Sequence, residues 1–135
     1  MLKTLFVETR AKSQFVNITE HLRAIVRDSG VASGVLHVFV PHTTAGITIN
    51  ENADPSVIHD FLRDMDRLLP LSQMYYRHAE GNSASHLKTS IVGTSQTVVI
   101  QESDLLLGTW QGIYLCEFDG PRRRTVHVKV SADAA

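Results

Sequence analysis

Cysteine is almost absent from this sequence of 135 residues, and long apolar runs are missing altogether. The single cysteine, Cys116, cannot form an intrachain disulfide, and the first ten residues do not resemble a signal peptide, so we predict a cytoplasmic protein. No segment approaches the roughly 20 apolar residues that a membrane-spanning helix requires. The net charge is only −1, from 13 basic and 14 acidic residues, which gives no general indication of nucleic-acid or membrane binding.

The residues that are present suffice for one hydrophobic core. Hydrophobic residues make up 43% of the chain and charged residues 20%, as in ordinary globular domains. The sequence contains no repeat, low-complexity tract or linker. We therefore predict a single domain over residues 1–135.

Alternation of apolar and polar residues predicts about seven strands. The first two, Leu2 to Thr9 and Gln14 to Ile18, are interpreted as a pair joined by a short connection. The others are predicted at residues 34–40, 45–49, 97–101, 113–118 and 125–130. Since several of these strands are joined by short turns, the pattern favours an α+β fold with an antiparallel or mixed, sandwich-like sheet over a doubly wound parallel sheet.

Two helices have clear boundaries, and a third is predicted from Ser83. Thr19 is expected to cap a helix that ends at Gly30. The pair Asp54-Pro55 predicts the start of the second helix, because an aspartate accepts free N–H groups and proline fits the first helical position. Apolar residues at helical spacing continue that helix as far as Pro70.

Seven histidines are present, and three of them stand in polar or turn-forming surroundings, namely His42, His78 and His86. Three neutral imidazoles can bind Zn²⁺ and leave a fourth position open for water or substrate. Their spacing matches no established metal motif, so the competing interpretation is a loop of polar side chains that hydrogen-bond to one another. The other four are interpreted as structural or solvent-exposed: His21, His37, His59 and His127.

Oxygen-bearing side chains cluster between Asn50 and Asp54 and suit a hard cation such as Mg²⁺, which often bridges a protein to diphosphate. Glu51 suits general acid or base chemistry, whereas Asp54 also has the structural role of a helix cap. Asn82 follows a glycine at the start of the third predicted helix, where free N–H groups can hold an anion, and Lys88 lies one turn further on.

Trp110 and Gln111 lie between two glycines and form a candidate contact for a heteroaromatic ring. A tryptophan that is simply buried is an equal alternative. Cys116 is interpreted as a packed side chain and not as a nucleophile. The basic run 122–124 is interpreted as a solvated turn.

Three blocks of the sequence together resemble the YjbQ-like (UPF0047) family. They are the segments His42–Pro55, His78–Lys88 and Leu107–Arg124. The resemblance implies an α+β homotrimer with polar sites near subunit boundaries. It also implies a polar site that contains His42, Glu51, Asp54, His78, Asn82 and His86. From the residue types we predict that the three histidines bind a metal ion and that Glu51, Asp54 and Asn82 are catalytic. Lys88, Trp110 and Gln111 are the predicted substrate-binding residues.

The family is often described as a secondary thiamine-phosphate synthase, and the resemblance therefore implies a thiamine-phosphate synthase-like transferase. Such an enzyme joins an aminopyrimidine-methyl diphosphate to a thiazole phosphate and releases diphosphate. Lys88 and the basic run 122–124 are expected to hold phosphate oxygens, and Trp110 is expected to lie against a ring. The alternatives are a metal-dependent hydrolase of a phosphate- or amide-containing substrate and a non-catalytic protein that binds a small ligand.

Overall fold

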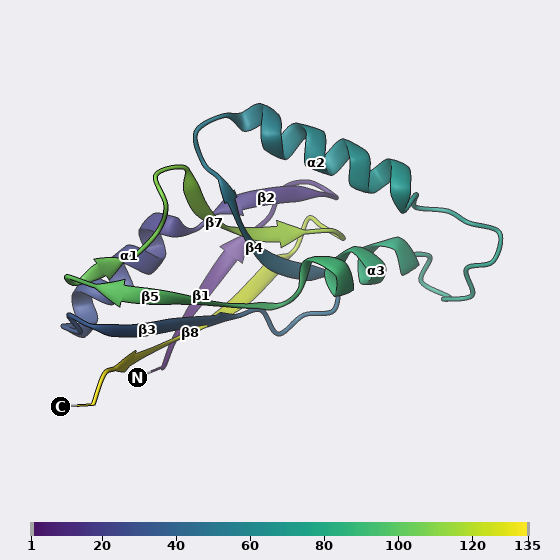
Figure 1. Ribbon diagram of the computed structural model, residues 1–135. Helices are drawn as coiled ribbons and strands as arrows, with labels where there is room; N and C mark the ends of the chain where they lie inside the picture. The colour runs from purple at the N-terminus through teal and green to yellow at the C-terminus, as the bar shows by residue number, and fades with distance from the viewer. Residues whose placement is uncertain (1, 135) are drawn as a thin grey trace.

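The computed structural model describes residues 2–134, which fold into two packed antiparallel sheets and three helices (Figure 1). The large sheet contains, in spatial order, β1 (Leu2–Glu8), β8 (Arg123–Ala132), β3 (Gly34–Phe39), β5 (Ser95–Gln101) and β6 (Asp104–Leu105). The small sheet contains β2 (Gln14–Asn17), β7 (Gln111–Glu117) and β4 (Ala45–Glu51). The predicted α+β, sandwich-like fold is confirmed.

The first two strands were predicted to pair with each other, and this prediction is wrong. β1 pairs with β8 in the large sheet, whereas β2 pairs with β7 in the small sheet. The short connection between them carries the chain from one sheet to the other. The turn signal in the sequence is local and does not specify which distant strand each segment will meet.

The main core lies between the two sheets, and α1 (Thr19–Ser29) closes one end of it. Gly30 ends α1 in the left-handed conformation, with φ of 71°, as predicted. The predicted Thr19 cap is wrong, because the side chain of Asn17 accepts the Thr19 N–H at 3.0 Å. Instead, the Thr19 hydroxyl accepts the Ile113 N–H at 2.8 Å, which ties α1 to β7.

The second helix, α2 (Pro55–Leu68), lies on the outer face of the small sheet (Figure 1). The side chain of Asp54 caps it by accepting the Ser56 N–H at 2.9 Å, as the Asp-Pro pair predicted. The ring of Phe61 packs against Phe15, with ring centroids 5.2 Å apart, and this contact holds α2 against β2. Among residues 2–134, none of the helices combines the length and the apolar character that crossing a membrane requires.

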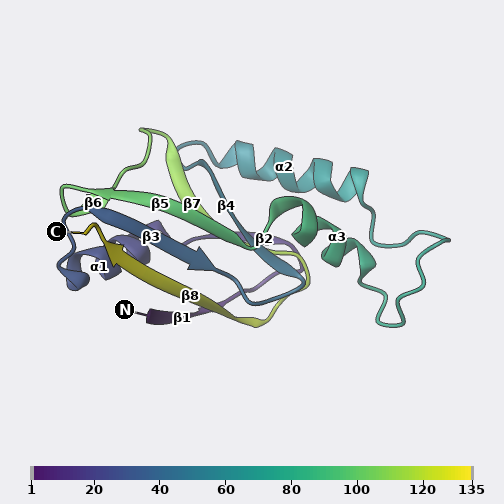
Figure 2. The ribbon, with the colours of Figure 1, turned by 60° about the horizontal axis from the view of Figure 1, so that its bottom comes forward.

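The third helix, α3 (Ser83–Val92), packs against β4, and the residue after the helix, Gly93, lies beside the start of that strand. A Cβ atom at Gly46 would lie only 2.4 Å from the carbonyl oxygen of Gly93, so only glycine permits this close approach. The hydroxyl of Ser85 donates to the Phe118 carbonyl at 2.5 Å. The first turn of α3 is therefore held beside the end of β7, and the connection over residues 69–82 extends beyond the sheets (Figure 2).

Candidate functional site

Three histidines from separate segments line one pocket with a volume of about 380 Å³. His42 comes from the connection between β3 and β4, His78 from the connection between α2 and α3, and His86 from α3. The other lining residues are Pro41, Thr43, Thr44, Glu80, Asn82, Asp119, Arg122 and Arg124. We call this cavity the histidine pocket.

His42 presents a hydrogen-bond donor to its surroundings. Its Nε2 atom accepts the Thr125 N–H at 2.9 Å, so in the neutral ring the proton is on Nδ1. Burial and the neighbouring Arg124 guanidinium lower the pKa of His42 below its usual range. At neutral pH, His42 is therefore an uncharged imidazole with a free Nδ1–H.

His78 and His86 form a close pair. Their ring centroids are 5.1 Å apart and their planes are nearly perpendicular, so the edge of one imidazole faces the other. His86 is half-buried on α3, whereas His78 is exposed on the connection before it. The rigid helix thus fixes one imidazole, and the connection brings the second one to it.

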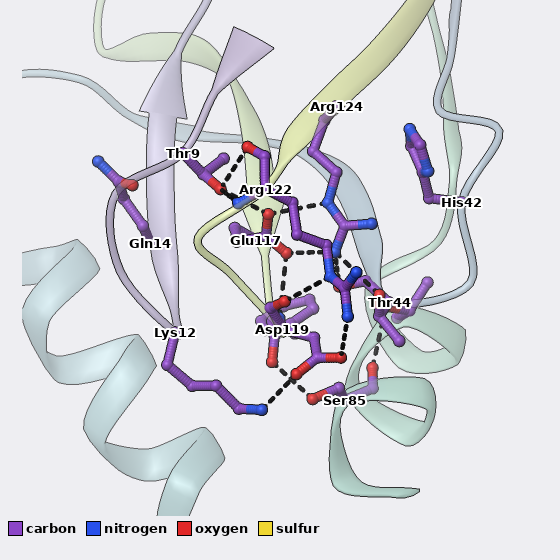
Figure 3. A network of polar contacts seen from close by, with 12 residues as sticks. Thr9, Lys12, Gln14, His42, Thr44, Ser85, Glu117, Asp119, Arg122 and Arg124 are labelled. Carbon is purple, nitrogen blue, oxygen red and sulfur yellow. Dashed lines mark hydrogen bonds and ion pairs between the residues drawn. The ribbon is translucent and has the colours of Figure 1, made fainter. Parts of the chain in front are cut away.

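The floor of the pocket contains a buried ion pair between Arg124 and Glu117 (Figure 3). Arg124 is 4% exposed and Glu117 is 0% exposed. The guanidinium also donates to the hydroxyl of Thr44 at 2.8 Å, and Glu117 accepts the hydroxyl of Thr9 at 2.7 Å. The interpretation of residues 122–124 as a solvated turn is therefore wrong for Arg124, because the strand that follows the turn carries this side chain into the interior.

Asp119 joins the buried pair to the pocket wall (Figure 3). Its carboxylate accepts from Lys12, from the Asn82 amide at 2.8 Å and from Arg122 at 3.1 Å. Burial raises the pKa of Asp119, but these donors outweigh burial and lower it to about 2. The carboxylate is thus charged at neutral pH and occupied by donors of its own chain.

Asn82 lies at the start of α3 and is 6% exposed. Its Nδ2 donates to Asp119, which fixes the orientation of the amide, because turning it over would place two oxygens against each other. Its Oδ1 is the one buried side-chain polar atom in the described part of the chain that lacks a hydrogen-bond partner. A buried acceptor without a donor costs free energy. The wall of the histidine pocket therefore carries one hydrogen-bond acceptor, Asn82 Oδ1, for which the described residues provide no donor.

Lys88 does not line the histidine pocket. Its side chain is buried and donates to Asp66 of α2 at 2.5 Å. It faces a separate cavity of about 510 Å³ that is also lined by Lys12 and Ser85. The structure therefore places Lys88 as a link between α2 and α3.

Four further residues with predicted functional roles gather at the opposite end of the small sheet: Glu51, Asp54, Trp110 and Gln111. We call this group the tryptophan corner. In the β4–β7 ladder, Ala45 pairs with Glu117 at one end and Glu51 with Gln111 at the other. Strands rise about 3.4 Å per residue, so the two ends lie roughly 20 Å apart. None of the four residues lines the histidine pocket.

Glu117 and Asp119 were not among the predicted site residues, although the sequence contains a signal for one of them. Glu117 stands in the apolar run 113–118, and charged residues are rarely buried without a partner. A glutamate in such a strand thus indicates a buried cation nearby. Nothing local indicates that the cation is Arg124 or that Asp119 shares its donors with the pocket.

The described residues contain no group of three or more histidine, cysteine, aspartate or glutamate side chains placed to hold a metal ion. The hydrogen bond at His42 explains part of this finding, since its Nε2 lone pair is occupied by the Thr125 N–H. The three histidines share a pocket but, within one chain, they do not converge on one point. A metal ion at these histidines stays a prediction.

The two-sheet fold is shared with a class of small α+β proteins for which crystal structures exist. An uncharacterised conserved protein of the YjbQ/UPF0047 family from Clostridium acetobutylicum has a TM-score of 0.93 and 50% identity, covering 96% of this chain and 99% of that one. A YbjQ-like protein of unknown function from Sulfolobus solfataricus also has a TM-score of 0.93, with 30% identity, covering 98% and 97%.

The chain belongs to the UPF0047 (YjbQ-like) family, whose sequence model matches residues 3–133. The UPF0047 protein YugU of Bacillus subtilis is 51% identical over 130 residues, covering 96% of this chain and 98% of YugU. The UPF0047 protein MJ1081 of Methanocaldococcus jannaschii is 48% identical over 136 residues, covering 98% of each. The predicted family is thus confirmed, and membership establishes the fold and not a reaction.

Proposed function

We propose that this protein is a thiamine-phosphate synthase-like transferase whose histidine pocket binds the diphosphate of its substrate. The proposal combines the family resemblance with one observation: three histidines and two arginines from distant segments line the same pocket. Imidazole and guanidinium groups are suitable donors for phosphate oxygens.

We also propose a cytoplasmic location, where the buried and free Cys116 would stay reduced.

The proposed reaction needs donors where negative charge develops. The bond between the methylene carbon of the aminopyrimidine and the diphosphate oxygen breaks, and diphosphate leaves with the electron pair. The thiazole nitrogen uses its lone pair to form the new C–N bond. Because charge accumulates on the leaving diphosphate, preorganised donors around it lower the barrier.

The pocket keeps several donors available because its buried carboxylates are already occupied. Glu117 accepts from Arg124, and Asp119 accepts from Lys12, Asn82 and Arg122. The Nη2 atoms of both arginines already donate within the chain, so Nη1 of each arginine, His42 Nδ1–H and the amino end of α3 are the donors proposed for a ligand. Glu80 is exposed at the rim, where its charge is largely screened by solvent.

The test uses purified protein, the two precursors and Mg²⁺, with formation of thiamine phosphate as the readout. We expect Arg122→Ala to lower kcat/KM at least about tenfold, since a hydrogen bond to a charged group contributes about 1.5–3 kcal/mol. Arg123→Ala is the matched control, because the Arg123 guanidinium lies over the Phe6 ring and away from the pocket. Wild-type product no higher than that of His78→Ala would refute the proposal.

The state of His42 is a separate prediction. We expect the ring to be neutral at pH 7 with its proton on Nδ1, and to titrate below the usual histidine pKa of about 6.5. Nitrogen-15 NMR of the imidazole distinguishes the two neutral forms and follows the titration. A proton on Nε2 would contradict the hydrogen bond from Thr125, and a midpoint above about 6.5 would contradict the lowering of the pKa by burial and the Arg124 guanidinium.

A metal-dependent hydrolase is the second candidate, favoured by the shared pocket of three histidines. Its predicted general base, Glu51, lies at the tryptophan corner, so it would have to come from another copy of the chain. It requires His42 to release the Thr125 N–H so that its lone pair is available to a metal ion. Elemental analysis of protein without a histidine tag checks this: about one Zn²⁺ per chain, with ester hydrolysis lost on chelation, supports the hydrolase. Ligand-induced stabilisation without any turnover would instead indicate a binding protein.

We also propose that the protein assembles as a homotrimer in which the tryptophan corner of one copy completes the histidine pocket of another. Two features support this: large apolar side chains such as Phe6 and Trp110 are exposed, and the two groups of predicted site residues lie roughly 20 Å apart within one chain. Mixing an inactive Glu51→Gln chain with an inactive His78→Ala chain should restore activity. If mixed trimers stay inactive, the site does not combine residues of two copies.

A further inference from the structure

A second pocket adjoins the histidine pocket and shares two of its residues. It has a volume of about 630 Å³ and is lined by Tyr75, Tyr76, Arg77, His78, Ser83, His86 and Leu87. We call it the tyrosine pocket. Because His78 and His86 line both cavities, the edge-to-face histidine pair stands where the two meet.

Five of the seven side chains that line the tyrosine pocket are aromatic or apolar, the others being Arg77 and Ser83, and several are exposed. The rings of Tyr75 and Tyr76 meet edge to face, with centroids 5.3 Å apart. Tyr75 is 73% exposed and Leu87 is 41% exposed, so the connection before α3 and the surface of α3 both present apolar surface to solvent. A concave group of exposed apolar side chains beside a polar pocket is typical of a ligand site.

We infer that the tyrosine pocket binds a planar aromatic ring of the same molecule whose phosphate occupies the histidine pocket. This inference rests on the proposed function. Aromatic side chains favour ring ligands through stacked and edge-to-face contacts, and the Arg77 guanidinium adds a cation for the face of such a ring. The volume also falls within the range usual for small-molecule sites, about 300–1,000 Å³.

The inferred position differs from the one that the sequence predicted. Trp110 was the candidate ring contact, but it lies in the tryptophan corner, roughly 20 Å from the histidine end of its sheet. Tyr75 and Tyr76, by contrast, adjoin the cavity that holds the proposed phosphate donors. In this arrangement the histidine pair lies beside the bond that joins the ring-bearing group to the phosphate.

The experiment compares the dissociation constants of benzyl phosphate and methyl phosphate, measured by calorimetry on the full chain. These probes share the phosphate and differ in the ring. We expect benzyl phosphate to bind about tenfold more tightly to the wild type. In the double variant Tyr75→Ala, Tyr76→Ala the two dissociation constants should lie within about twofold of each other, and that of methyl phosphate should be unchanged. The double variant Tyr75→Phe, Tyr76→Phe should keep the preference for benzyl phosphate.

Two single variants serve as comparisons. Met74→Ala changes an exposed neighbour in the same connection that lines neither pocket, and it should have no effect. Loss of the preference in Trp110→Ala would overturn the inference, because the ring would then bind at the tryptophan corner. Equal binding of both probes by the wild type would also overturn it while leaving the phosphate pocket intact. If neither probe binds, the phosphate pocket itself is wrong and the inference fails with it.

Discussion

The two ends of the small sheet hold their polar side chains in opposite ways. At the histidine end, Arg124 and Glu117 are buried and paired, and Asp119 accepts from three side chains. At the tryptophan corner, Asp54 and Trp110 are exposed. A buried charge costs several kcal/mol unless it is paired, so the contacts of the chain itself fix the geometry of the histidine end. At the corner, Asp54 and Trp110 are in contact with solvent, so this desolvation cost does not arise there.

The largest expected difference between the two ends is in stability. Arg124→Met should lower the free energy of unfolding by about 3–5 kcal/mol, because it leaves the Glu117 carboxylate buried without its partner. Urea unfolding measures the change. The matched control is Arg123→Met on the exposed face, for which we expect a loss within about 1 kcal/mol. Similar losses in both variants would show that burial does not distinguish the two arginines.

The next largest effect is the loss of stability at low pH that Asp119 causes. The pKa of Asp119 is about 2 in the folded protein, compared with about 3.9 in an unfolded chain, so its charged form stabilises the fold at pH above about 4. That contribution, about 2 kcal/mol, is lost as the pH falls from about 4 to about 2. The free-energy difference between the wild type and Asp119→Asn should therefore shrink over this interval in acid unfolding experiments. A difference that stays constant with pH would contradict the depressed pKa.

A smaller effect is expected at the tryptophan corner from Asp54→Ala. The variant removes the acceptor for the Ser56 N–H at the start of α2, so the melting temperature should fall by less than it does for Asp119→Asn. Asp54→Ser is the control, because serine also accepts at this position and should retain most of the stability. If the serine and alanine variants have the same melting temperature, the capping hydrogen bond does not explain the contribution of Asp54 to stability.

The smallest effect is expected from Trp110→Ala in dilute protein. The Trp110 residue is 62% exposed, so the free energy of unfolding should change by less than about 0.5 kcal/mol. Chemical unfolding at low micromolar concentration checks this value. A larger loss there would mean that the chain itself buries the ring, whereas an additional loss that appears only at high concentration would measure burial by another copy.

Several parts of the fold were predictable because their causes lie within a few residues. The Asp54-Pro55 start of α2 and the Gly30 end of α1 follow from capping, and both are confirmed. Thr19 shows the limit of such rules, since Asn17, only two positions earlier, provides the acceptor instead. Local signals thus located the elements well and identified the capping atoms less reliably.

The candidate site was predictable in part. The sequence singled out His42, His78 and His86, and the structure brings them to one pocket. It also suggested an anion site with Lys88, which instead pairs with Asp66 at another cavity. Residue type identified the chemistry that is available, but only the packing of α3 against β4, with its link to α2 through Lys88 and Asp66, decided which side chains face the pocket.

The sequence by itself determined the α+β class, the approximate positions of the three helices and of seven of the eight strands, and the supply of imidazole and carboxylate groups, because these follow from periodicity, capping and composition. The two-residue strand β6 was not predicted. Only the tertiary structure decided that the first two strands enter different sheets and that Arg124 is buried against Glu117. It also decided that the tryptophan corner lies away from the histidines. The reason is that these outcomes depend on contacts between residues far apart in the chain, such as Arg124 and Thr44 at a separation of 80 positions, and local propensity does not encode them.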